Sequence, residues 1–146
     1  MFRGHHPTRV DEKGRLKVPA EYKREIDEKY GAQFYITSTD GKIAQVYPLE
    51  VWEAREQKLL AHALNPHVKK YLTATSFYGQ VAEMDGQGRL LLPALLREKA
   101  ALKGDVSVLG ALQYLEIRVL EDLSKQVETN PVTPEDEEAL AQLGIQ

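Results

Sequence analysis

The sequence lacks cysteine, and this absence excludes several kinds of site at once. Without cysteine there are no disulfides, no thiol nucleophiles and no cysteine zinc sites, a composition consistent with a reducing cytoplasm. The first residues contain no apolar segment of the kind that a signal peptide needs. No stretch approaches the roughly 20 apolar residues of a membrane span. We therefore expect a cytoplasmic protein without a membrane partner.

The motifs of the common enzyme classes are also missing. The chain contains no Gly-x-Ser-x-Gly, P-loop, His-Glu-x-x-His or dinucleotide-binding glycine pattern. The adjacent His5 and His6 would point to opposite faces of a strand, which makes them a poor chelating pair. We expect no catalytic residue, no cofactor, no metal site and no small-molecule substrate.

A large excess of basic residues is absent too, because the net charge of the 146 residues is −3. The charges are nevertheless unevenly distributed. Residues 1–24 carry seven Lys or Arg against three acidic residues, a net charge of +4, and residues 121–146 carry one Lys against seven acidic residues, a net charge of −6. This asymmetry indicates a basic working end and an acidic tail. A charge of +4 predicts weak binding of a polyanion by a single copy.

What the sequence does contain is a pattern that occurs twice. Residues 10–20 read VDEKGRLKVPA and residues 84–94 read MDGQGRLLLPA. Asp, Gly, Arg, Leu, Pro and Ala recur at one offset, since 85 − 11 and 89 − 15 both give 74. Such self-similarity indicates one structural unit repeated along the chain. Units of roughly 60 residues are marginal alone, so we expect the two copies to share a core.

Each copy predicts a turn, then a strand. Asp and Gly favour the turn. Leu16 and Val18 alternate with Lys17, which is typical of a half-buried strand. The second copy has leucine at all three positions, 90–92, and this predicts a strand that is covered on both sides.

A helix and a hairpin follow the strand in each copy. Pro19 and Pro93 suit the first turns of helices over residues 21–30 and 95–102, with Gly31 and Gly104 as C-terminal caps. Hairpins are predicted from strands at 34–37 with 43–47, around an Asp-Gly turn, and at 106–109 with 114–118. Between the motif and the end of the unit, the second copy has three residues fewer than the first, and we place these missing residues in its hairpin.

Helices over 49–64 and 67–75 have no full counterpart in the second copy. They either link the copies and cap the core or, through a stripe that includes Trp52, form an interface with another subunit. Near the C-terminus, Thr133 and Pro134 predict the start of a short acidic helix.

In both copies an arginine follows the turn, four residues after an aspartate: Asp11 with Arg15, and Asp85 with Arg89. A fixed carboxylate can hold the guanidinium in one pose and complete its hydrogen bonds. An arginine held in this way can bind a phosphate or the edge of guanine. The alternative is an ordinary turn closed by a local ion pair, and the repetition of the pair makes that alternative weaker.

The doubled Asp-x-x-x-Arg pattern, with Met1-Phe2-Arg3-Gly4 at the start, resembles the MraZ family, a bacterial group with two AbrB/SpoVT-like modules in one chain. The resemblance covers about residues 1–125. It implies an α+β fold in which two pseudo-symmetric units form a swapped-hairpin-type β-barrel with flanking helices. It also implies a ring-shaped homo-oligomer. The resemblance further implies a nucleoid-associated transcriptional regulator, which binds short direct repeats of double-stranded DNA in the promoter of the division and cell-wall gene cluster.

The resemblance carries the DNA-contacting role over to both Asp-Arg pairs, and the basic N-terminal segment adds three further candidates. The full set of expected DNA-binding residues is Asp11, Lys13, Arg15, Asp85, Arg89, Arg3 and Lys17. Gln87 stands where the first copy has Lys13, so the second copy either contacts DNA less strongly or mainly keeps the architecture.

We expect four regions: one module over 1–53, a helical linker over 54–76, a second module over 77–124 and an acidic tail with a short helix over 125–146. The alternative function is a ring-forming protein-protein interaction module without DNA readout. The net acidity, the aromatic helix stripe and the acidic tail favour this alternative.

Overall fold

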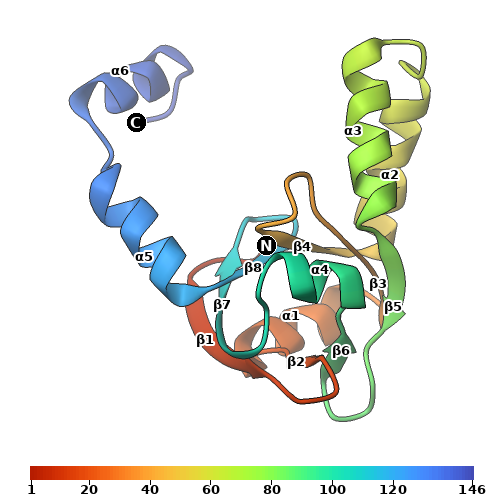
Figure 1. Ribbon diagram of the computed structural model, residues 1–146. Helices are drawn as coiled ribbons and strands as arrows, with labels where there is room; N and C mark the ends of the chain where they lie inside the picture. The colour runs from red at the N-terminus through yellow and green to blue at the C-terminus, as the bar shows by residue number, and fades with distance from the viewer.

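In the computed structural model, which describes residues 1–146, both copies of the repeat contribute to one antiparallel sheet (Figure 1). The first copy provides β1 (His5–Val10), β2 (Arg15–Lys17), β3 (Gln33–Thr37) and β4 (Ala44–Pro48), and the second provides β5 (Gln80–Glu83), β6 (Arg89–Leu91), β7 (Gly104–Gly110) and β8 (Leu115–Arg118). The strand order is β5-β3-β4-β8-β7-β1-β2-β6. The two end strands meet where the Asp85 N–H donates to the Arg89 carbonyl at 2.9 Å, so the sheet forms a nearly closed barrel.

Strands pair between the copies rather than within them alone. β1 pairs with β7 along its whole length, and the equivalent β5 pairs with β3. The equivalent strands β2 and β6 lie side by side, as do β4 and β8. This arrangement is that of a pseudo-twofold axis, and it confirms the expected α+β fold with a swapped β-barrel.

The core is shared, because one cluster of 20 buried residues draws on both copies. Leu16 and Leu90 face each other in the β2–β6 pair and are both fully buried. Fully buried Phe34 and Ile117 come from different copies as well. Neither copy could bury these side chains alone, since its partner strands belong to the other copy.

Two helices pack against the barrel, α1 (Ala20–Lys29) and α4 (Ala94–Lys99). Pro19 and Pro93 precede these helices as N-cap residues and do not lie in the first turns as predicted, and each helix begins one residue earlier than predicted. The predicted extension of α4 to Leu102 is wrong. The helix ends at Lys99, Ala101 adopts a left-handed φ of 54°, and the Leu102 N–H donates to the Arg97 carbonyl at 2.9 Å. This is a Schellman-type end in which alanine takes the position expected for glycine.

The strand registers show where the second copy is shorter. Thr8 pairs with Val106, and its equivalent Ala82 pairs with Phe34. Phe34 therefore corresponds to Val106, an offset of 106 − 34 = 72, so two of the three missing residues precede β7. The prediction that the loss lies in the hairpin is wrong for these two, because the shorter α4 accounts for them.

Two helical pairs extend from the barrel: α2 (Leu49–Leu60) with α3 (Pro66–Phe77), and α5 (Leu120–Thr129) with α6 (Pro134–Gln142) (Figure 1). Trp52 at the base of α2 is buried and stacks on Tyr35, with ring centroids 4.7 Å apart. Thr133 begins α6 with a capping box, as predicted. No helix combines the length and apolar character that crossing a bilayer requires.

Candidate nucleic-acid interface

The β2–β6 ribbon has one face in the core and one face outside the barrel. Since successive side chains alternate between faces, the burial of Leu16 and Leu90 places their neighbours on the outer face. In the register of the ribbon, Arg15 lies opposite Leu91 and Lys17 lies opposite Arg89. Arg15 and Arg89 are therefore diagonal neighbours, with their Cα atoms roughly 7–8 Å apart.

The first Asp-Arg turn is fixed by three hydrogen bonds to one carboxylate. Asp11 Oδ1 accepts from the backbone N–H groups of Lys13 at 3.0 Å and Arg15 at 2.9 Å. Asp11 Oδ2 accepts from Arg15 Nε at 2.7 Å. Gly14 has a φ of 85°, which a residue with a side chain rarely adopts. The guanidinium is thus oriented through Nε, and its terminal nitrogens have no partner within the protein.

The second turn repeats this geometry atom for atom. Asp85 Oδ1 accepts from the N–H groups of Gln87 at 2.9 Å and Arg89 at 3.0 Å, and Oδ2 accepts from Arg89 Nε at 2.9 Å. Gly88 has a φ of 75°. A single ion pair could arise from local turn formation alone, but here the same oriented arginine occurs twice on one face.

Both carboxyl groups are held in the charged form. The hydrogen bond from the Arg15 backbone N–H is the largest influence on the pKa of Asp11 and lowers it. Desolvation acts in the opposite direction, and the Arg15 guanidinium lowers the pKa further. At Asp85 desolvation opposes the shift, and the Arg89 backbone N–H and guanidinium outweigh it, so this pKa is lowered too. A lowered folded-state pKa means that the ionised carboxylates stabilise the turns at neutral pH. This contribution is lost only as the pH falls through the lowered pKa.

The remaining predicted residues are distributed unevenly. Lys13 is exposed on the first turn, and Lys17 extends to the second turn, where its Nζ donates to the Gln87 carbonyl at 2.5 Å. Arg3 stands apart from the other six residues. It precedes β1, whereas the first turn follows β1, and a six-residue strand spans roughly 20 Å. Six of the seven residues therefore lie around the β2–β6 ribbon.

The expectation that β6 is covered on both sides is wrong. Leu91 is 54% exposed, and it lies opposite Arg15 on the outer face of the ribbon. Its neighbours Leu90 and Leu92 are fully buried. Three consecutive leucines thus obey the two-residue alternation of a strand, and the middle one faces outward.

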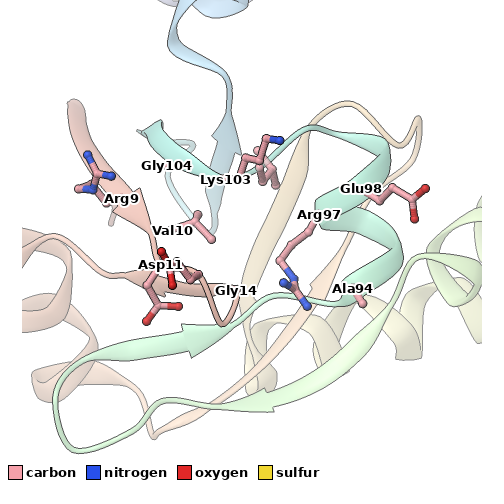
Figure 2. A pocket seen from close by; sticks show the side chains of 11 residues that line it. Arg9, Val10, Asp11, Gly14, Ala94, Arg97, Glu98, Lys103 and Gly104 are labelled. Carbon is pink, nitrogen blue, oxygen red and sulfur yellow. The ribbon is translucent and has the colours of Figure 1, made fainter.

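Sequence reasoning missed two basic side chains from the helices. A Cβ on Gly14 would lie 2.2 Å from the Arg97 guanidinium, and one on Gly88 would lie 3.0 Å from Lys23 Cδ. Each turn is thus covered by a side chain from the other copy, and Figure 2 shows Arg97 directed toward Gly14. A signal was available, since Lys23 and Arg97 are separated by the same 74 residues as the motif.

This arrangement suits a double-stranded nucleic acid. A two-stranded β-ribbon fits the major groove of B-DNA, where arginine can donate two hydrogen bonds to the O6 and N7 atoms of guanine. The outer face of the ribbon presents Arg15, Lys17 and Arg89. No group of three or more His, Asp or Glu side chains is placed to hold a metal ion.

Comparison with known proteins gives one consistent family. A family model described as "MraZ protein, putative antitoxin-like" matches residues 1–73 and 79–143. A protein of Acidobacterium capsulatum named "Transcriptional regulator MraZ" is 58% identical over 146 residues, covering 99% of this chain and 100% of that protein. A protein of the same name from Koribacter versatilis is 56% identical, covering 99% of this chain and 100% of that protein. Another from Haemophilus influenzae is 37% identical, covering 80% of this chain and 79% of that protein.

Proposed function

This chain belongs to the MraZ family, and we propose that it is a transcriptional regulator that binds double-stranded DNA through the outer face of the β2–β6 ribbon. The observation that carries the proposal is the pair of Asp-Arg turns on that face, which share the same hydrogen bonds. The names of the relatives support regulation of transcription. The contacting residues in this proposal are Asp11, Lys13, Arg15, Lys17, Asp85 and Arg89.

The geometry of each turn supports base readout rather than general attraction alone. Arg15 Nε donates to Asp11 Oδ2, which leaves both terminal nitrogens of the guanidinium free to donate to two acceptor atoms of one ligand. A rigid, planar donor pair matches the guanine edge, whereas a mobile lysine would bind phosphate as a point charge. We assign base readout to Arg15 and Arg89, and phosphate contacts to Lys13 and Lys17.

A single chain presents few charges, so the proposal includes an oligomer. Several weak contacts on one DNA molecule gain from effective concentration when the subunits are linked. We propose a ring of identical subunits that binds short direct repeats in the promoter of division and cell-wall genes, because the family resemblance implies this arrangement. In this proposal residues 1–53 and 77–124 act as the modules, 54–76 as the linker and 125–146 as the tail.

A protein-interaction module is the second candidate, and exposed leucines at the tip of the α2–α3 pair favour it. Leu60 is 67% exposed and Leu64 is 99% exposed. In that case the Asp-Arg turns would only close the barrel. The two candidates differ in salt dependence, because phosphate contacts make affinity fall steeply with salt.

The test is a DNA titration at fixed salt with two fragments. One carries direct repeats in helical phase, and the other has the repeat spacing shifted by half a helical turn. The oligomer mass is measured on the same samples. We expect tight binding of the in-phase fragment only, by a large oligomer. Equal binding of both fragments, or of neither, would remove the DNA-reading role and leave the interaction module.

A further inference from the structure

A groove of about 870 Å³ lies beside the first Asp-Arg turn, between the end of β1 and the loop that joins α4 to β7 (Figure 2). Its charged lining residues are Arg9, Asp11, Glu12, Arg97, Glu98 and Lys103. Arg9 is already paired with Asp105 at 2.8 Å, and Asp11 is paired with Arg15. Arg97 has no carboxylate partner, so it is the uncompensated guanidinium of this groove.

The position of Arg97 is fixed from two sides. Its Nε donates to the Leu92 carbonyl at 3.1 Å. Its guanidinium also occupies the space that a Cβ on Gly14 would need, 2.2 Å from Cζ and Nη1. The terminal nitrogens of Arg97 have no hydrogen-bond partner in the protein. A half-buried arginine that is held at Nε and open at its terminal nitrogens is suited to an oxyanion.

The first turn and Arg97 are part of one local structure. The Leu92 N–H donates to the Gly14 carbonyl at 3.0 Å, and the Leu92 carbonyl accepts from Arg97. Arg97 therefore lies next to the turn that orients Arg15. DNA that meets Arg15 would bring its own phosphates to this groove, and phosphate contacts fix the register of a protein on the duplex.

We propose that Arg97, which the second copy supplies, binds a backbone phosphate of DNA and positions the duplex against the first turn. The inference rests on the proposed DNA-binding function. The equivalent residue at the second turn differs, since Lys23 Nζ is paired with Asp27 at 2.7 Å. Lys23 covers Gly88 with its aliphatic chain and offers a charge that the protein has already compensated. The phosphate contact is thus specific to the first turn.

The experiment compares Arg97→Gln, Arg97→Lys, Lys23→Gln and Arg15→Ala with the wild type. Lys99→Gln is the matched control, because it removes the same charge from an exposed position of α4 that does not line the groove. Affinity for a repeat-bearing and a scrambled fragment is measured over a range of salt, with folding and oligomer mass checked for each protein.

For Arg97→Gln we expect affinity to fall roughly threefold to tenfold for both fragments, with the ratio between them unchanged. The slope of log affinity against log salt should decrease by about one for each engaged subunit. Arg97→Lys should keep most of the slope, and Lys23→Gln and Lys99→Gln should match the wild type.

Two results would overturn the assignment. If Arg97→Gln lowers the ratio between the fragments as Arg15→Ala does, Arg97 supports the turn instead of binding phosphate. If Arg97→Gln binds like the wild type while Arg15→Ala does not, Arg97 makes no contact and the proposed function still stands. Absence of wild-type binding would instead remove the proposed function, and this inference with it.

Discussion

The two Asp-Arg turns share one backbone geometry but differ in the cations around them. At the first turn, Lys13 and Arg97 have no carboxylate within ion-pair distance. At the second turn, Lys17 is hydrogen-bonded to the Gln87 carbonyl and Lys23 is paired with Asp27. The residues that shape the turn are kept in both copies. The side chain that covers the turn from a helix is an arginine without a carboxylate partner at the first turn, and a lysine paired with an aspartate at the second.

For the proposed function, this difference bears on the kind of DNA site that the ribbon would bind. A strictly two-fold ribbon would bind a duplex equally well in either direction, and operator symmetry mirrors protein symmetry. The unequal turns give the ribbon a direction. Subunits that bind direct repeats all in the same orientation need a DNA-binding surface without two-fold symmetry. The comparison therefore predicts that equivalent substitutions in the two turns have unequal effects.

The largest inequality should appear between Arg15→Ala and Arg89→Ala. An arginine that reads a base contributes about 1–3 kcal/mol of discrimination, so we expect Arg15→Ala to lower specific affinity on the order of tenfold to a hundredfold. Arg89→Ala should cost less, because fewer free cations surround it. Anisotropy titrations at fixed salt measure both, with oligomer mass as the control. Equal losses would show that the turns read DNA equivalently.

Gly14→Ala and Gly88→Ala should separate folding from binding. Both positions have a positive φ, and an alanine there costs roughly 1–2 kcal/mol. Both substitutions should therefore lower the free energy of unfolding, measured by urea denaturation, and Gly14→Ala should lower it more because of its closer contact. Only the Cβ at position 14 collides with a guanidinium. Gly14→Ala should thus displace Arg97 and weaken DNA binding more than Gly88→Ala does. The reverse order would contradict the role of Arg97.

A smaller effect is expected from exchanging the charge at the tips of the turns. Gln87→Lys gives the second turn the lysine of the first, and Lys13→Gln does the opposite. One phosphate contact changes the salt slope by about one per engaged subunit. We expect Gln87→Lys to raise affinity a few-fold and steepen the slope, and Lys13→Gln to lower both. If Gln87→Lys leaves the slope unchanged, the second turn does not reach the backbone of the DNA.

Much of this comparison could be predicted from the sequence, because it depends on local rules. The repeat at one offset, the turn residues and the strand alternation around Leu16 all follow from short-range chemistry. The Asp11–Arg15 pair could be predicted for the same reason, since four residues and one turn separate its members. The family resemblance added the strand exchange, which no local pattern specifies.

The remaining features depend on contacts between distant residues. Arg97 meets Gly14 only because β2 and β6 pair across the copies. The exposure of Leu91 could not be predicted from three consecutive leucines, because hydrophobicity alone does not say which face is covered. Arg3 belongs to the basic segment in the sequence, but in the structure the length of β1 separates it from the turns.

The smallest expected effects concern the C-terminal ends of α1 and α4. Ala101 adopts a left-handed φ at the end of α4, whereas Gly31 after α1 does not, and no atom lies within 4 Å of a Cβ there. Ala101→Gly removes strain but adds disorder to the unfolded chain, a net stabilisation of roughly 0.5 kcal/mol. Gly31→Ala should stabilise by about as much, through the unfolded state alone. Chemical denaturation of both variants measures these shifts. Because neither residue lines the groove or the ribbon face, DNA affinity should stay at the wild-type value; a loss in either variant would mean that the helix ends help to hold the turns.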